Sequence, residues 1–176
     1  MNSLGKVEMR LGRYAAASEH LRTALAQYRQ LANCVGEAWT LNHLGTVHTH
    51  LGLATGQPQQ AVALFREIGD RRGEASALNG LGEADHAAGR PADALAHHSA
   101  AHAIAVDLGL LDEQARAHTG LGNAEHTLGR AARARRHYRR ALTLYTDLGM
   151  PEADELRAHL ATDEQRCRAT MLDSTR

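Results

Sequence analysis

Apolar residues recur along this chain at intervals of three, four and seven positions. One such run is Leu21, Ala24, Leu25 and Tyr28, and the positions between these four are mostly polar. This spacing places the apolar side chains on one face of an α-helix. Runs of this kind fill most of the chain, so the pattern predicts an all-α fold built from amphipathic helices.

The helical runs repeat with a long period that is marked by a Leu-Gly pair. The spacings between successive pairs are 40, 37 and 40 residues. A fixed period of this length is typical of stacked helical repeats. The pairs are Leu4-Gly5, Leu44-Gly45, Leu81-Gly82 and Leu121-Gly122.

Each unit contains two predicted helices, which we call helix A and helix B. Helix A carries the Leu-Gly pair and ends at a second glycine seven residues later, as at Gly89 and Gly129. A glycine at that place is a common helix C-terminal stop. Because the first glycine lacks a Cβ, it lets the facing helix approach closely. A bulky side chain at Gly82 or Gly122 should therefore overpack the crossing by ~1–3 kcal/mol.

Helix B of each unit shows small residues where two helices must touch. The pairs are Ala17 and Ala24, Ala94 and Ala101, and Ala134 and Ala141. Together with Gly5, Gly82 and Gly122 they match the small-residue pattern of the tetratricopeptide repeat, which these units resemble. The large helix-B residue of that motif appears as Leu21 and Tyr138, but as His98 in the third unit.

The resemblance implies a right-handed α-solenoid of antiparallel helix pairs. The period predicts an array over residues 1–161, followed by a frayed C-terminal tail over residues 162–176. Such an array buries its apolar faces between neighbouring repeats, so it needs no central globular core. The expected units are repeats at 1–34, 35–71, 72–111 and 112–150 and a capping helix at 151–161.

Two irregularities interrupt the period. The second unit is three residues short between Gly52 and Ala61, which predicts a longer loop and a helix B shortened to about 58–68. Its first alanine packing position is then lost, either as a tolerated deletion or as a hinge or ligand notch beside helix A. The first unit opens in the middle of helix A, because Met1 aligns with Leu41 and Leu78. We therefore expect the chain to be the C-terminal piece of a longer protein, or to have a misplaced start.

Composition narrows the function classes. The chain has 176 residues, a formal net charge of zero, 3% aromatic residues and two cysteines. A neutral chain argues against a general nucleic-acid binder, and two distant cysteines indicate a reducing, cytoplasmic setting. No apolar run approaches the ~20 residues that cross a bilayer. Catalytic and phosphate-loop motifs are absent, so we expect neither an enzyme nor a cofactor.

The resemblance also implies a binding surface. In tetratricopeptide arrays helix A lines the inner groove and contacts a protein or peptide ligand. Asparagine and threonine side chains can pair with a ligand backbone, although they are equally common as solvated positions. The positions carried over are Trp39, Asn42, Thr46 and Thr49, then Ser76, Asn79, Glu83 and His86, then Arg116, Thr119, Asn123 and His126.

Two other clusters offer alternative functions. His98 and His102 are four residues apart on helix B, a spacing that can chelate a metal, although partly buried, hydrogen-bonded histidines are the simpler reading. Six arginines lie between Arg130 and Arg140 without an acid among them, and Arg133, Arg136 and Arg140 form a basic patch. Such a patch can bind the phosphates of a nucleic acid or an acidic partner, or it can be a solvated outer face.

The style of the repeats resembles one group of regulators. The link Ile68-Gly69-Asp70-Arg71-Arg72-Gly73-Glu74-Ala75 and the Pro151-Glu152-Ala153-Asp154-Glu155 segment look like the C-terminal arrays of actinobacterial NB-ARC/SARP-type regulators. In those proteins a DNA-binding domain and an NTPase domain precede the repeats. The resemblance implies a partner-sensing array with a possible NTPase domain upstream of it.

Overall fold

The computed structural model describes the backbone of residues 2–53 and 56–173, and the side chains of residues 3–53 and 56–162. Within these ranges the chain is helical between short turns and contains no strand. The helices are α1 (Asn2–Arg10), α2 (Tyr14–Gln30), α3 (Cys34–His50), α4 (Gln57–Ile68), α5 (Arg71–Ala87), α6 (Pro91–Asp107), α7 (Leu111–Thr127), α8 (Ala131–Asp147) and α9 (Glu152–Asp173).

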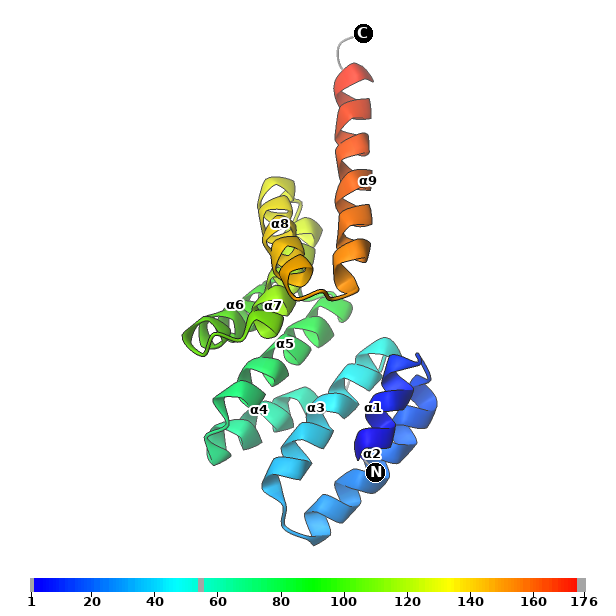
Figure 1. Ribbon diagram of the computed structural model, residues 1–176, viewed down its shortest axis with the longest axis vertical. Helices are drawn as coiled ribbons and strands as arrows, with labels where there is room; N and C mark the ends of the chain where they lie inside the picture. The colour runs from blue at the N-terminus through cyan, green and yellow to red at the C-terminus, as the bar shows by residue number, and fades with distance from the viewer. Residues whose placement is uncertain (1, 54–55, 174–176) are drawn as a thin grey trace.

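The helices form antiparallel pairs that stack one on the next, as Figure 1 shows. Helix α3 contacts α5, and α5 contacts α7, whereas successive B helices of the described chain make no such contact. The side of a stack on which successive repeats touch is the inner side of its curve. We therefore call α1, α3, α5 and α7 the inner helices and α2, α4, α6 and α8 the outer helices.

The Leu-Gly pairs mark close helix crossings, as expected. An ideal Cβ at Gly82 would lie 2.6 Å from Nε2 of His98, and one at Gly122 would lie 2.6 Å from Cδ1 of Tyr138. Both facing side chains are the large residues of the following helix B, and both are buried. The second glycine of each unit ends helix A with a left-handed backbone, for example φ 73° at Gly129.

Large side chains also pack against glycines where an outer helix meets the next inner helix. The ring of Phe65 fills the space above Gly73, and the ring of Tyr28 does the same above Gly36. In the third unit the corresponding outer position is Ala105, and the next inner helix places Glu113 opposite it. A small outer residue thus leaves room for a long polar side chain between α6 and α7.

The second repeat has the predicted short helix B, since α4 runs from Gln57 to Ile68. Pro58 lies in its first turn and is buried against Gly45, where an ideal Cβ would come 2.7 Å from the proline Cγ. The first alanine packing position, residue 54, lies outside the described residues. A cavity of about 100 Å³ is lined by residues of α3, α4 and α5 that include Thr49, Gln59 and Ala84.

The C-terminal helix is longer than the sequence suggested. Ala153, Leu156 and Leu160 of α9 are buried in a cluster with residues of α8, as expected of a capping helix. The helix then continues to Asp173 and projects beyond the array in Figure 1. The segment expected as a frayed tail is thus helical over 162–173, where no proline or glycine interrupts it. Residues 174–176 lie outside the described residues.

Candidate functional site

Three of the expected groove residues are buried rather than displayed. Asn79 is fully buried, and Asn42 and Ser76 are nearly so. The Nδ2 of Asn42 donates to Oγ of Ser76 at 3.2 Å, and Nδ2 of Asn79 donates to Oε2 of Glu113 at 2.9 Å. The structure therefore places these three side chains inside the stack, and not on the surface where they were expected. Equivalent positions of successive inner helices stack on one another, so the polar groups pair between repeats.

The most strongly paired charges of the inner surface are Glu83 on α5 and Arg116 on α7. The guanidinium donates to both carboxylate oxygens, with Nε–Oε1 at 2.7 Å and Nη2–Oε2 at 2.8 Å. Its Nη1 also donates to the Ser76 carbonyl oxygen at 3.3 Å. The side chains remain partly open, 35% exposed for Glu83 and 26% for Arg116. They therefore lock two inner helices together and still reach the surface.

This pair shifts the pKa of both its members. Burial alone would raise the pKa of Glu83, but the charge and hydrogen bonds of Arg116 hold that pKa below its usual value. Burial would lower the pKa of Arg116, and the carboxylates of Glu83 and Glu113 instead raise it. Both groups are therefore charged across the ordinary pH range.

The remaining groove positions lie on or near the inner surface with their local bonds made. Thr46, Thr49 and Thr119 are half-buried, and each hydroxyl donates to the carbonyl oxygen four residues earlier. Asn123 accepts a hydrogen bond from the hydroxyl of Tyr138, with the two oxygens 2.8 Å apart. These residues have polar groups left to offer, but their own conformations are fixed.

The aromatic and histidine members of the expected groove differ in exposure. Trp39 is half-buried and packs edge-on against Phe65, with ring centroids 5.0 Å apart. His86 is half-buried, whereas His126 is exposed, with its ring 6.4 Å from that of His159 on α9. Nine of the twelve expected groove positions are thus at least partly exposed, and Asn42, Ser76 and Asn79 are buried.

His98 does not pair with His102 to form the alternative metal site. The Nδ1 of His98 is 3.0 Å from Oδ1 of Asn79, and its Nε2 is shielded from solvent at the crossing between Gly82 and Gly120. Burial is the largest cause that lowers the pKa of His98 to about 4. His98 is therefore a neutral packing residue rather than a ligand paired with His102. Among the described side chains, no group of three or more His, Cys, Asp or Glu has a metal-binding arrangement.

The basic patch has a compensating acid that the sequence did not reveal. Glu125 on α7 is buried and pairs with Arg130, Nη1–Oε2 3.2 Å, and with Arg133, Nη1–Oε1 3.7 Å. The cluster contains no acid of its own, and at its N-terminal end the acid comes from the preceding helix. Arg136 and Arg140 are exposed on the outer helix.

A repeated acid–arginine clasp across the turn between helices A and B was missed from the sequence. Glu8 pairs with Arg13, Asp85 with Arg90, and Glu125 with Arg130, each five residues apart. Asp85 is buried and also holds His97, with Oδ2–Nδ1 at 2.7 Å. The signal was present, since in each case the arginine follows the second glycine. In the second unit His48 and Leu53 hold these two positions.

Comparison with known proteins agrees with this geometry. A family model for the tetratricopeptide repeat matches residues 1–72 and 73–147. The chain belongs to the tetratricopeptide repeat family. Repeats of this family form non-catalytic scaffolds that generally mediate protein–protein interactions. No curated protein matches the sequence. Within the described part of the chain, no helix has the length and apolarity to span a membrane.

Proposed function

We propose that this tetratricopeptide array is a non-enzymatic scaffold that binds a protein or peptide segment through its inner surface. The proposal rests on one observation, which is that side-chain hydrogen bonds join α3, α5 and α7 into one layer. Asn42, Ser76 and Arg116 connect the three helices in sequence, and Glu83 completes the network. The surface above it consists of partly exposed polar side chains from the same helices.

A hydrogen-bonded layer of this kind favours binding for a physical reason. Association costs free energy for each side chain and loop that must be ordered, and a rigid surface has already met that cost. The Glu83–Arg116 pair presents both a donor and an acceptor group, and Thr46, His86 and Asn123 add further polar groups nearby. Such a mixture suits a peptide backbone, which offers both N–H and C=O groups.

The experiment compares matched positions on the inner and outer surfaces. A photo-crosslinking residue placed at Thr46 or His86 should capture the partner, and one at the exposed outer residues Ala63 or Ala96 should not. Thr46→Arg should weaken binding of the captured partner, whereas Ala96→Arg should leave it unchanged. Equal capture from the outer positions, or unchanged binding by the Thr46 variant, would reject the inner surface as the site.

We further propose that the array is the partner-sensing, cytoplasmic segment of a larger regulatory protein with an NTPase domain upstream. The support is the resemblance of the Ile68–Ala75 link to the corresponding links of NB-ARC/SARP-type regulators. When the array is joined to such a domain, we expect it to restrain nucleotide hydrolysis until the partner binds. An unchanged hydrolysis rate after removal of residues 1–161 would contradict this role.

A further inference from the structure

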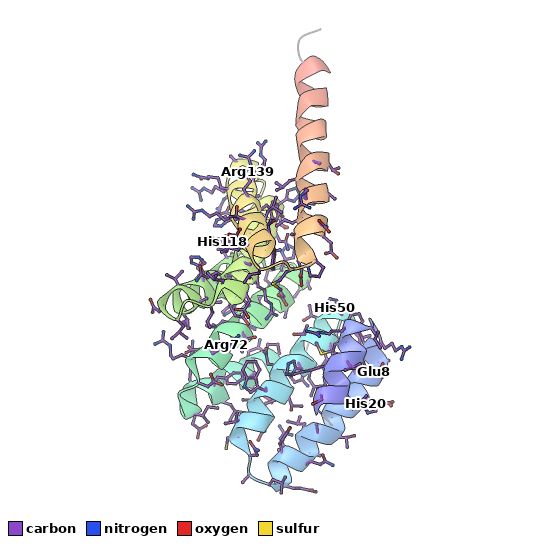
Figure 2. The ribbon with its side chains drawn as sticks, viewed as in Figure 1. Glu8, His20, His50, Arg72, His118 and Arg139 are labelled. Atoms are coloured by element: carbon purple, nitrogen blue, oxygen red, sulfur yellow. The ribbon has the colours of Figure 1, made fainter. Side chains whose placement is uncertain are left out.

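Three histidines from three helices meet at the junction of the third and fourth repeats. They are His102 on α6, His118 on α7 and His137 on α8. The ring centroids of His102 and His118 are 4.5 Å apart, and those of His118 and His137 are 5.3 Å apart. His118, labelled in Figure 2, is buried, while His102 and His137 are half-buried. We call these three residues the histidine cluster.

The cluster lies between two outer helices. In the described chain α6 and α8 do not contact each other, and α7 packs against both. His118 of α7 therefore lies between His102 on one outer helix and His137 on the other. The Nδ1 atoms of His118 and His137 are 3.1 Å apart, so one ring donates a hydrogen to the other. This leaves Nε2 of both rings outside that hydrogen bond.

Comparison between repeats shows that two of these histidines replace aliphatic residues. The position of His102 is Leu25, Val62 or Leu142 in the other units, and that of His118 is Leu41 or Leu78. Leu41, Val62 and Leu78 belong to one buried apolar cluster. Replacing such residues with imidazoles gives up apolar burial at this junction. The junction therefore carries polar rings at positions where the other repeats have aliphatic side chains.

The surroundings of the cluster are positive. Arg140 of α8 acts electrostatically on all three rings, and Arg136 acts on His137. Among the described side chains, the acid that acts on His137 is Glu125, whose carboxylate is already held by Arg130 and Arg133. Burial first, and then the mutual repulsion of the rings and Arg140, lowers the pKa of His118 to about 4. A cation is disfavoured at such a place, and an anion is attracted to it.

We propose that the histidine cluster, with Arg136 and Arg140 at its rim, binds a phosphoryl group on the outer surface. Two guanidinium groups supply charged, multidentate donors, which suit phosphate oxygens. The imidazole N–H groups of His102 on α6 and His137 on α8 add donors. In this arrangement Nδ1–H of His118 donates to Nδ1 of His137, so that the His137 proton lies on Nε2. Three oxygens of one phosphoryl group can thus be met from α6 and α8 together. The phosphoryl group is either free phosphate or part of a phosphorylated partner.

This site is separate from the inner surface of the proposed scaffold function. Each can therefore fail without affecting the other. The test titrates the full chain with inorganic phosphate, and in a second arm with a short phosphoserine peptide, at constant ionic strength. The ring resonances of all histidines are followed by NMR at pH 7.

We expect saturable shifts at His102, His118 and His137. His20 occupies the same repeat position as His137 without the other two rings and serves as the internal control. Arg140→Gln should weaken phosphate binding about tenfold, since a charged hydrogen bond is removed. His118→Leu restores the aliphatic residue of the other repeats, so it should keep the fold. It should weaken phosphate binding, because the His137 ring loses the Nδ1–Nδ1 hydrogen bond that orients it. Tighter binding of the phosphoserine peptide would assign a partner as the source, and equal binding would assign free phosphate.

Several results would overturn the proposal. Shifts of equal size at His20, or the same shifts with sodium chloride, would show general ionic screening. Unchanged phosphate binding by both Arg140→Gln and a folded His118→Leu would place the anion elsewhere. Titration with Zn²⁺ provides the remaining comparison. Saturable Zn²⁺ binding at these rings without phosphate binding would make the cluster a metal site.

Discussion

The helix crossing at Gly122 offers a direct test of the packing. Gly122→Ala adds a Cβ that would lie 2.6 Å from Cδ1 and 3.0 Å from Cζ of Tyr138. The Tyr138 ring is 3% exposed, and its hydroxyl is held by Asn123 at 2.8 Å. The ring has little room to retreat, so the two helices must separate.

The size of the effect follows from two opposing terms. Overpacking a close contact costs ~1–3 kcal/mol, and the fixed ring favours the upper end. Alanine recovers ~1 kcal/mol of helix propensity relative to glycine. The net expectation is a loss of about 2 kcal/mol in the free energy of unfolding, or about 4–8 °C in Tm for a chain of this length.

Gly80→Ala is the matched control, because the atoms nearest its ideal Cβ are the ends of polar side chains rather than a buried ring. That Cβ would lie 3.3 Å from Oδ1 of Asn42 and 3.7 Å from Nη2 of Arg116. Asn42 must shift slightly to admit the methyl group, which offsets the ~1 kcal/mol gain in helix propensity, so the variant should stay within ~1 kcal/mol of the parent protein. Urea unfolding followed by circular dichroism measures both variants under the same conditions.

A double-mutant cycle separates the crossing from other effects of Gly122→Ala. Tyr138→Ala alone should destabilise the chain by ~3–5 kcal/mol through a cavity. Combined with Gly122→Ala, the loss should be smaller than the sum by ~1 kcal/mol or more, since the clash is gone. Strict additivity, or a Gly122→Ala variant as stable as Gly80→Ala, would refute the close-crossing explanation.

Three further predictions concern charge. Asp85→Asn removes the charged acceptor from Arg90 and His97 and should lower the free energy of unfolding by ~1–3 kcal/mol. Asp112→Asn, at the exposed pair with Arg72, should lower it by less than ~1 kcal/mol in the same unfolding assay. Equal losses of stability in the two variants would contradict the clasp. The pKa of His118 falls from 6.5 to about 4 on folding, so the folded state binds fewer protons and stability should fall as the pH drops from 6.5 towards 4. In urea unfolding at pH 7 and pH 5, His118→Leu should show a smaller loss of stability over that range. An equally steep loss in the variant would contradict the role of His118. The pKa of Glu83 is lowered by Arg116, so the pair stabilises the fold above the ordinary carboxylate pKa. The loss of stability in Glu83→Gln relative to the parent protein should therefore shrink as the pH falls below about 4.5. A loss that stays constant with pH in thermal unfolding would count against the pair.

Helix positions and close crossings could be predicted from the sequence because they depend on local spacing. The Leu-Gly period located the helix pairs, and the three missing residues located the short α4. Helix ends at Gly89 and Gly129 follow from the left-handed conformation that glycine adopts readily. The length of α9 was underestimated because a weak apolar pattern was taken as the end of the helix, although helix formers continue to Asp173.

The fate of each polar side chain was decided by tertiary structure. Asn79 looks like any exposed amide in sequence, yet Glu113, 34 residues away, accepts its hydrogen bond in the interior. Glu125 pairs with arginines of the next helix, and the histidine cluster joins three separate helices. Periodicity fixes which residues share a face of one helix. Burial and pairing depend on which side chain of the next repeat lies against that face, and this is set only when the repeats stack.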